Sequence, residues 1–388
     1  MTAPPEYVVR MWLFFGGYFL VGGITLPFFP VWLDARGLSD VEIAQVIAIP
    51  TLIRVFLTPF AGVYADRARN RRFAVITFTV PAVIAFLFAY PVTGFLPLLI
   101  TTGVAFVVWG LAMPPAEALA LTGVRRYGLD YGCMRMMGSV SFIVANIASG
   151  ILLTLLWPDA IYFFLLFALV ISAAVSFALP VTPPDLRALD DAARPDTRPS
   201  RAVLGNRGFV LLVLAVGFIQ GSHAMLYSFG SIEWTALGFT GVEIGFFWAF
   251  ALVCEIALFA WGKPLLARFG AYGLLIVGAV ATILRWSLFP VVPAVGFLGF
   301  ALLQMLHGLT FGATYLGTQQ LIARLVPERM TASAQGIFAM ATGLMIAGAT
   351  SISGPIYAAW GINGFLAMVP IAGLGLALLI AVRQYARD

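Results

Sequence analysis

Stretches of about 20 apolar residues, each long enough to cross the hydrocarbon core of a bilayer, recur along this sequence from end to end. Of the 388 residues, 61% are hydrophobic and only 10% are charged. A soluble chain of this length could not cover its surface with so few charges, so lipid must cover most of it. The sequence therefore predicts a membrane protein with many transmembrane helices.

Twelve such stretches can be placed, which predicts an all-α fold with twelve transmembrane helices. The first is too long for the apolar core of a cleavable signal, and Arg10 is its only basic flanking residue. It is therefore expected to remain as the first helix. The predicted spans are 8–33, 41–64, 73–92, 95–119, 131–156, 159–180, 208–233, 242–262, 271–291, 294–322, 331–358 and 363–383.

The basic residues between these spans lie almost all on one side. With both termini placed in the cytoplasm, the opposite side keeps only Arg36, which is the asymmetry of the positive-inside rule. We therefore expect a multi-pass protein of the bacterial inner membrane with cytoplasmic termini. The same asymmetry accounts for the formal net charge of +5, so no nucleic-acid partner is expected.

One polar, proline-rich segment, 181–206, interrupts the apolar pattern and is typical of a flexible linker. It leaves six predicted spans in 1–180 and six in 207–388. The sequence therefore predicts two six-helix bundles joined by a cytoplasmic linker. This plan is typical of transporters built from repeated units, which bind their solute in a central cavity between the halves.

Ionisable residues inside the predicted spans are few. They are costly in lipid and by default face a cavity or a partner, so each is a functional candidate. Acids and bases alternate in each half, as expected if they pair across a cavity. The alternative is structural ion pairs that only hold helices together. The set is Arg54, Glu117, Arg135, His223, Glu255, Arg285 and His307.

The sequence gives little support for a catalytic site or a metal site. Cys133 and Cys254 have neither the spacing of metal ligands nor a disulfide pattern, and we interpret them as small apolar fillers. An enzyme would need a nucleophile–base pair or metal ligands at membrane depth, which the sequence does not offer. The linker is too short to be a signalling domain. We therefore expect a monomeric carrier with no metal and no cofactor, in contact with membrane lipid and a small solute.

The segment after the second predicted span resembles the loop signature between the second and third helices of the major facilitator superfamily. It reads Gly62-x-x-x-Asp66-Arg67-x-Arg69-Asn70-Arg71-Arg72. Glycine allows close helix approach, the aspartate can hold a basic partner, and arginines can pair with carboxylates or lipid phosphates. The resemblance implies a gating role for Gly62, Asp66, Arg67 and Arg71.

Further motifs, in unbroken order along the chain, resemble those of the phenylpropionate permease family. The resemblance covers nearly the whole chain and implies proton-coupled uptake of an aromatic carboxylate such as 3-phenylpropionate. More distant relatives carry nucleosides or sugars with protons, so a sugar or nucleoside stays open as the alternative solute. The motifs are Leu129-Asp130-Tyr131-Gly132-x-x-Arg135-x-x-Gly138-Ser139-Val140-x-Phe142, Gln220-Gly221-Ser222-His223-Ala224, Gly245-x-x-Trp248, Glu255, Arg285-Trp286 and Gln304-x-Leu306-His307-x-x-Thr310-Phe311.

A more remote resemblance is to the lactose permeases. Glu117 and Arg135 match their carboxylate–guanidinium sugar pair, and Phe142 stands in the place of a sugar-stacking tryptophan. Two features depart from their pattern. Thr310 occupies the position of the carboxylate that takes and releases the proton, and the eleventh predicted span lacks a charged partner for the seventh. An uncoupled facilitator therefore stays open. Three coupling residues of these permeases are matched by Glu255, Arg285 and His307.

These resemblances and the chemistry of the side chains assign a role to each candidate. Arg135 is expected to hold the solute's carboxylate, with Glu117 as its resting partner, because a guanidinium grips a carboxylate bidentately and keeps its charge. Glu255 is the preferred proton carrier, and a structural Glu255–Arg285 pair is its alternative. The remaining solute-binding candidates are Phe142, His223, Trp248 and Arg285, and the remaining coupling candidates are Glu117 and His307.

Overall fold

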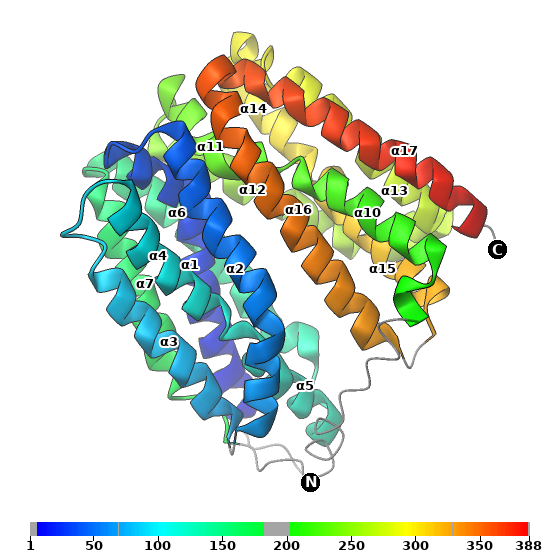
Figure 1. The fold of residues 1–388 in the computed structure, drawn as a ribbon, viewed down its shortest axis with the longest axis horizontal. Coiled ribbons are helices and arrows are strands. Elements are labelled where there is room, and N and C mark those ends of the chain that lie inside the picture. Colours follow the sequence, from blue (N-terminus) through cyan, green and yellow to red (C-terminus); the bar gives the residue numbers. More distant parts are fainter. Residues whose placement is uncertain (1–5, 69, 182–201, 328–329, 387–388) are drawn as a thin grey trace. The chain divides into compact units, whose positions relative to one another are not determined.

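The computed structural model describes residues 6–68, 70–181, 202–327 and 330–386, and within these ranges every regular element is helical (Figure 1). The predicted all-α fold is therefore confirmed. The elements are α1 (Tyr7–Ala35), α2 (Asp40–Arg67), α3 (Arg71–Leu87), α4 (Phe95–Gly110), α5 (Met113–Tyr127), α6 (Tyr131–Leu155), α7 (Asp159–Ser176), α10 (Arg207–Gly221), α11 (Ala224–Ala236), α12 (Gly241–Ala260), α13 (Gly262–Leu288), η1 (Val292–Val295), α14 (Gly296–Met305), η2 (Gly308–Ala313), α15 (Thr314–Leu325), α16 (Thr331–Trp360), η4 (Gly361–Ala367) and α17 (Met368–Ala386).

Ten helical segments of the described chain are long and apolar enough to cross a membrane. The predicted span 73–92 corresponds to α3, which has 17 residues. The last two predicted spans fall within one continuous stretch, Ser333–Arg383. The multi-pass membrane character is thus supported directly, while the count of twelve stays a prediction.

The helices form two compact units. The predicted linker at 181–206 lies mostly outside the described residues, so the division into 1–180 and 207–388 stays a prediction. Unit 1 comprises Met1–Leu38, Ile49–Pro195 and Thr240–Gly245, and unit 2 comprises Ser39–Ala48, Asp196–Phe239 and Phe246–Asp388.

In unit 1, α1 lies directly against α6. A Cβ built on Gly23 of α1 would lie 2.6 Å from the carbonyl oxygen of Phe142 on α6, so a larger residue does not fit. Membrane helices commonly associate through small residues in this way, because lipid is as apolar as their side chains and gives them no hydrophobic reason to pack. The contact brings the side chain of Arg135 on α6 over the rings of α1.

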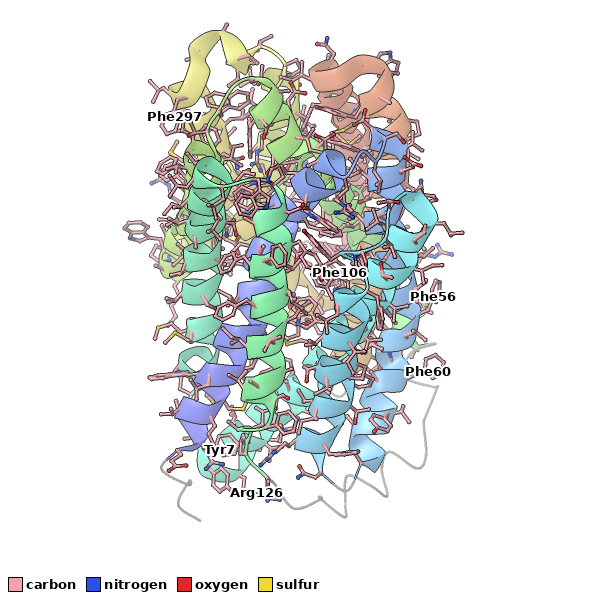
Figure 2. All side chains as sticks on the ribbon, turned by 90° about the vertical axis from the view of Figure 1, so that its left-hand side faces the viewer. Tyr7, Phe56, Phe60, Phe106, Arg126 and Phe297 are labelled. Atoms are coloured by element: carbon pink, nitrogen blue, oxygen red, sulfur yellow. The ribbon has the colours of Figure 1, made fainter. Side chains whose placement is uncertain are left out.

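The surface of unit 1 presents large aromatic side chains. Phe56 and Phe60 project outward from α2, and 55% and 69% of their surfaces are exposed (Figure 2). Water would solvate such a surface poorly, whereas lipid chains match it. The exposed aromatic side chains therefore agree with a helix face that lies against hydrocarbon.

In unit 2, one polar side chain joins two helix ends beside the apolar core. The Oδ1 atom of Asn206 accepts a hydrogen bond of 3.0 Å from the backbone N–H of Phe209, in the first turn of α10. Its Nδ2 atom donates one of 2.8 Å to the carbonyl of Leu325, where α15 ends. Helix ends leave such backbone groups unpaired, so Asn206 satisfies the start of one helix and the end of another.

The helices of unit 2 are interrupted at two points, and each interruption contains a polar residue of interest. α10 ends at Gly221 and α11 begins at Ala224, so His223 lies at the break. The element η2 is a π-helix that directly follows His307 and contains Thr310. Irregular backbone at membrane depth is tolerated where protein surrounds it, and π-helical turns are often found at functional sites.

Candidate functional site

Most of the predicted intramembrane residues fall into two clusters, one in each unit. Arg54 belongs to neither cluster. It packs against Gly110, where a Cβ would collide with the Arg54 Cδ atom. The Arg135 cluster of unit 1 consists of Phe15, Phe19, Glu117, Tyr131 and Arg135. The Arg285 cluster of unit 2 consists of His223, Glu255, Arg285, Gln304, His307 and Thr310.

Local sequence signals place the Arg135 cluster. α5 ends before Gly128, whose φ of 67° is the left-handed conformation that glycine adopts at helix ends. α6 begins after Asp130, whose side chain accepts a hydrogen bond of 2.5 Å from a backbone N–H in the first turn. Tyr131 and Arg135 lie one turn apart on α6, so both side chains reach Glu117 on α5.

The Glu117 carboxylate is shared between two donors. Arg135 forms an ion pair with its Oε1 atom, and the Tyr131 hydroxyl donates a 2.7 Å hydrogen bond to Oε2. The guanidinium carbon of Arg135 also lies 4.7 Å from the ring centre of Phe19 and 5.5 Å from that of Phe15. The Arg135 side chain is 36% exposed, so part of it is accessible. An accessible guanidinium beside aromatic rings offers partners for both parts of an aromatic carboxylate.

Arg285 is surrounded differently, because none of its surface is exposed. Its guanidinium donates to the side-chain oxygen of Gln304, to Nδ1 of His307 at 3.3 Å and to the hydroxyl of Thr310 at 3.3 Å. It also lies 5.1 Å from the ring centre of Trp286. The described hydrogen-bond acceptors of this buried cation are thus an amide, an imidazole and a hydroxyl.

The hydrogen bonds of His307 determine its tautomer. A guanidinium can only donate, so the Nδ1 atom that faces Arg285 must accept and carries no proton. The proton is then on Nε2, which lies 3.2 Å from Oε2 of Glu255 and donates to that carboxylate. His307 is therefore neutral and connects the cation to the anion in one chain, Arg285 to His307 to Glu255.

His223 is neutral for a different reason: it is fully buried and shares Thr310 with the Arg285 cation, so a second positive charge there would be costly. Its Nδ1 atom lies 3.1 Å from the carbonyl of Ile219, which can only accept, so Nδ1 carries the proton. Its Nε2 atom then accepts from the hydroxyl of Thr310, 3.1 Å away. That hydroxyl accepts a hydrogen bond from Arg285 and donates one to His223, so Thr310 connects these two side chains.

The direct Glu255–Arg285 pair considered from the sequence is corrected by this geometry. Among the described side chains, Glu255 bonds to His307, which lies between it and Arg285. The position where the lactose permeases have a carboxylate is filled by the bridging hydroxyl of Thr310. The cluster therefore holds one carboxylate and one guanidinium, with neutral groups between them.

Of the predicted aromatic residues, Trp248 lies near the Arg285 cluster. Trp248 donates from Nε1 to the hydroxyl of Ser231 at 2.9 Å, and its ring centre lies 6.2 Å from that of Tyr227. Tyr227 lies in turn 6.0 Å from His223, so these rings form an aromatic wall next to the Arg285 cluster. Phe142 lies two turns after Arg135 on α6.

The predicted gating residues are partly described. Arg71 donates a 3.0 Å hydrogen bond to the hydroxyl of Thr122, which ties the start of α3 to α5. A Cβ on Gly62 would meet no described atom within 4 Å, so the close helix approach expected there is not seen. The side chains of Asp66 and Arg67 lie outside the described part of the structure.

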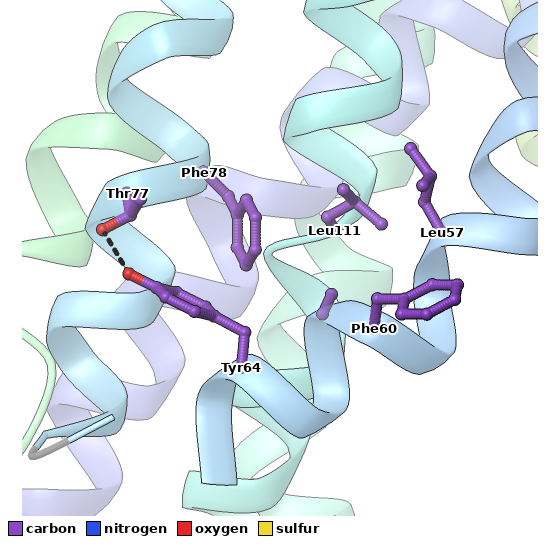
Figure 3. Close-up of a pocket in the computed structure, with 7 residues that line it drawn as sticks. Leu57, Phe60, Tyr64, Thr77, Phe78 and Leu111 are labelled. Atoms are coloured by element: carbon purple, nitrogen blue, oxygen red, sulfur yellow. Dashed lines mark hydrogen bonds between the residues drawn. The ribbon is translucent and has the colours of Figure 1, made fainter. Parts of the chain in front are cut away.

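An apolar hollow of about 330 Å³ opens beside α2 and α3 in unit 1 (Figure 3). Its polar groups are the hydroxyls of Tyr64 and Thr77, which lie 3.4 Å apart and bond to each other. It offers no charge to an ionised solute. The hollow is lined by Leu57, Phe60, Ala61, Tyr64, Thr77, Phe78 and Leu111.

Several members of the clusters had no role assigned from the sequence, among them Phe15, Phe19, Tyr131 and Gln304. Tyr131 and Gln304 lie inside the motifs that resemble the phenylpropionate permeases, and that position is the signal that could have identified them. In the described residues, no three His, Cys, Asp or Glu side chains gather as metal ligands would.

Membrane-length helices that bury hydrogen-bonded charges are typical of membrane transporters. The sequence model of the MFS_1 like family matches residues 8–366, and the chain belongs to this family. The expected membership of the major facilitator superfamily is thereby confirmed. Since proteins of this family are transporters, the chain is a transporter and not an enzyme.

Individual relatives cover nearly the whole chain. A protein of Escherichia coli strain K12, described as a probable 3-phenylpropionic acid transporter, is 28% identical over 369 residues, which cover 93% of this chain and 94% of that protein. The maltose permease of Geobacillus stearothermophilus is 27% identical over 380 residues, with coverages of 96% and 94%. A crystal structure of the nucleoside transporter NupG matches with a TM-score of 0.82 at 17% identity and covers 99% of this chain and all of NupG, which shows the shared fold.

The bridging role of Thr310 predicts the effect of removing its hydroxyl. Thr310→Val keeps the shape but leaves Arg285 and His223 each one hydrogen bond short, which should lower the free energy of unfolding by about 1–3 kcal/mol. Thr310→Ser should restore most of the loss. Thermal unfolding of the purified protein in detergent measures both variants. Equal melting temperatures for the Val variant and the unmodified protein would contradict the bridge.

Proposed function

We propose that this chain is a proton-coupled symporter of the bacterial inner membrane that takes up a small aromatic carboxylate by alternating access. Its termini are then cytoplasmic, and its twelve helices form two six-helix halves. The observation that carries the proposal is the accessible Arg135 guanidinium, flanked by Phe15 and Phe19 and paired with Glu117. The resemblance to a probable 3-phenylpropionic acid transporter supports the same solute class.

Solute binding uses the charge that Arg135 keeps in every state. The solute's carboxylate takes a place on the guanidinium, and its ring lies against the aromatic side chains beside it. Glu117 keeps the hydroxyl of Tyr131 as a partner while Arg135 is shared. A neutral sugar or nucleoside is the second candidate, because hydroxyls can bridge a carboxylate and a guanidinium and relatives include a maltose permease.

Proton coupling is assigned to Glu255, with His307 as its hydrogen-bond partner. The Glu255 carboxylate faces a neutral imidazole, whereas Glu117 faces a permanently charged guanidinium. A proton on Glu255 therefore sacrifices no direct ion pair. It also leaves the Arg285 charge without its anion, so the entry of an anionic solute together with the proton restores the charge balance.

The segment 62–72, which includes the end of α2 and the start of α3, is proposed to act in gating. The hydrogen bond from Arg71 to Thr122 supports this role, because it connects the start of α3 to α5, the helix that carries Glu117. A movement of the start of α3 is thereby linked mechanically to the Arg135 cluster.

Uptake by proteoliposomes decides between the solutes and tests coupling. We expect labelled 3-phenylpropionate to accumulate when the lumen is alkaline, and only to equilibrate without a pH gradient. Maltose and uridine serve as the competing solutes under both conditions. Accumulation of either of them in preference to 3-phenylpropionate would transfer the proposal to the second candidate, and gradient-independent uptake would make the chain a facilitator.

Arg135→Lys tests the carboxylate anchor. Lysine keeps the charge but presents a point charge in place of a bidentate fork, so uptake should fall by about tenfold or more, a loss of at least ~1.4 kcal/mol in binding. Initial uptake rates are compared at equal amounts of protein in the membrane. Arg125→Lys, at the exposed end of α5, is the matched control and should transport normally. Full uptake by the Arg135 variant would exclude the anchor.

Glu255→Gln tests the proton carrier. The amide keeps the shape but binds no proton, so the variant should exchange solute across the membrane and fail to accumulate it against a gradient. Counterflow and pH-driven accumulation are measured side by side, with Glu117→Gln as the matched change in the other cluster. If accumulation survives in the Glu255 variant and is lost in the Glu117 variant, the proton belongs to Glu117.

A further inference from the structure

Unit 2 contains a buried carboxyl group that the proposed mechanism does not use. Glu233 lies on α11 at the end of the predicted span 208–233, and 7% of its surface is exposed. Its Oε2 atom accepts a 2.6 Å hydrogen bond from the hydroxyl of Tyr357 on α16. No other partner of Glu233 is found among the described residues.

The donor is held in place by stacking. The ring of Tyr357 lies 4.4 Å from that of Phe229, with 11° between the ring planes. Phe229 precedes Glu233 by one turn of α11, so the stack directs the phenolic hydroxyl at the carboxyl group. Tyr357 is itself 8% exposed, which keeps the bond away from solvent.

Among the described residues, no cation on the helices around Glu233 forms an ion pair with it. Segment 331–367, which forms α16 and η4 against α11, has Tyr357 as its only ionisable side chain. On α12, Glu243 accepts hydrogen bonds from Thr240, and Glu255 is bonded to His307. On α13, the Nη1 and Nη2 atoms of Arg285 donate to its own cluster.

An ionised carboxylate in these surroundings would be a buried charge with one neutral donor. Such a charge is expensive in a low-dielectric interior, and a single phenolic hydrogen bond does not replace the hydration it has lost. A neutral carboxylic acid avoids that cost and still accepts the same hydrogen bond through its carbonyl oxygen. The surroundings therefore favour the form that carries a proton.

We propose that Glu233 is a further proton-binding site of this protein, separate from the Arg285 cluster, which holds its proton while Tyr357 is bonded to it. The proton leaves as H⁺ when α11 and α16 move far enough to admit water, and the carboxylate that remains is then hydrated. The site does not depend on the identity of the solute or on the role of Glu255.

Infrared spectroscopy of the purified full-length protein at neutral pH tests the proposal without any transport assay. The difference spectrum of the unmodified protein minus Glu233→Gln should contain the C=O stretching band of a protonated carboxylic acid. Tyr357→Phe removes the hydrogen bond to the carbonyl oxygen and should move that band to higher frequency. Glu243→Gln, a matched change on the neighbouring helix, should leave the band in place.

Two results would overturn the proposal. One is a Glu233→Gln difference spectrum that contains carboxylate bands without an acid band, which would mean that Glu233 is ionised. The other is an acid band whose frequency does not respond to Tyr357→Phe, which would mean that Tyr357 is not bonded to the protonated Glu233. Glutamine keeps a hydrogen-bond acceptor for Tyr357, so the Glu233 variant is expected to fold.

Discussion

Charged groups inside a bilayer have lost the water that stabilised them, and most features of this structure replace that water. The two clusters do so in different ways. Arg135 has an immediate counter-charge in Glu117 and remains partly accessible. Arg285 is fully buried, and an imidazole separates it from the nearest carboxylate of its cluster. In the proposed mechanism, one pair exchanges partners with a solute and the other responds to a proton.

The interruptions of the helices follow from the same constraint. A continuous α-helix uses all its backbone groups on itself, whereas a break exposes some of them and turns side chains inward. His223 lies at the break between α10 and α11, and Thr310 lies in the π-helix η2. The hydrogen bond between these two side chains therefore joins two irregular points of the backbone. The neutral hydroxyl of Thr310 accepts a hydrogen bond from the buried guanidinium of Arg285 and so replaces part of its lost hydration.

Much of the fold was predictable, because lipid imposes a length and a composition on every span. The predicted span 131–156, for example, coincides with α6 at Tyr131–Leu155. The breaks were not predictable, since hydropathy sums the composition of a window and contains no information on backbone hydrogen bonding. The single predicted span 294–322 is in fact η1, α14, η2 and α15 in succession.

The candidate site was predictable to a similar degree. Ionisable residues stand out in an apolar segment, so Glu117, Arg135 and Arg285 could be identified. Their partners Tyr131 and Gln304 are neutral and do not stand out in this way. The insertion of His307 between Glu255 and Arg285 depends on the rotation of three helices about their axes, which no property of a single span determines.

The π-helix η2 shows that side chains within a span can change position while the length and hydropathy of the span stay nearly the same. Gly308–Ala313 accommodates a wider turn than an α-helix, so a deletion of one residue there would leave a regular helix of nearly the same length and hydropathy. Because the wider turn holds the extra residue, the α-helices on either side of η2 would keep their orientation, whereas the residues inside η2 would change position. Such a chain would insert into the membrane as before, yet Thr310 could no longer reach Arg285 and His223 together. In this family, alignments that count apolar residues alone would therefore accept sequences whose polar clusters cannot assemble.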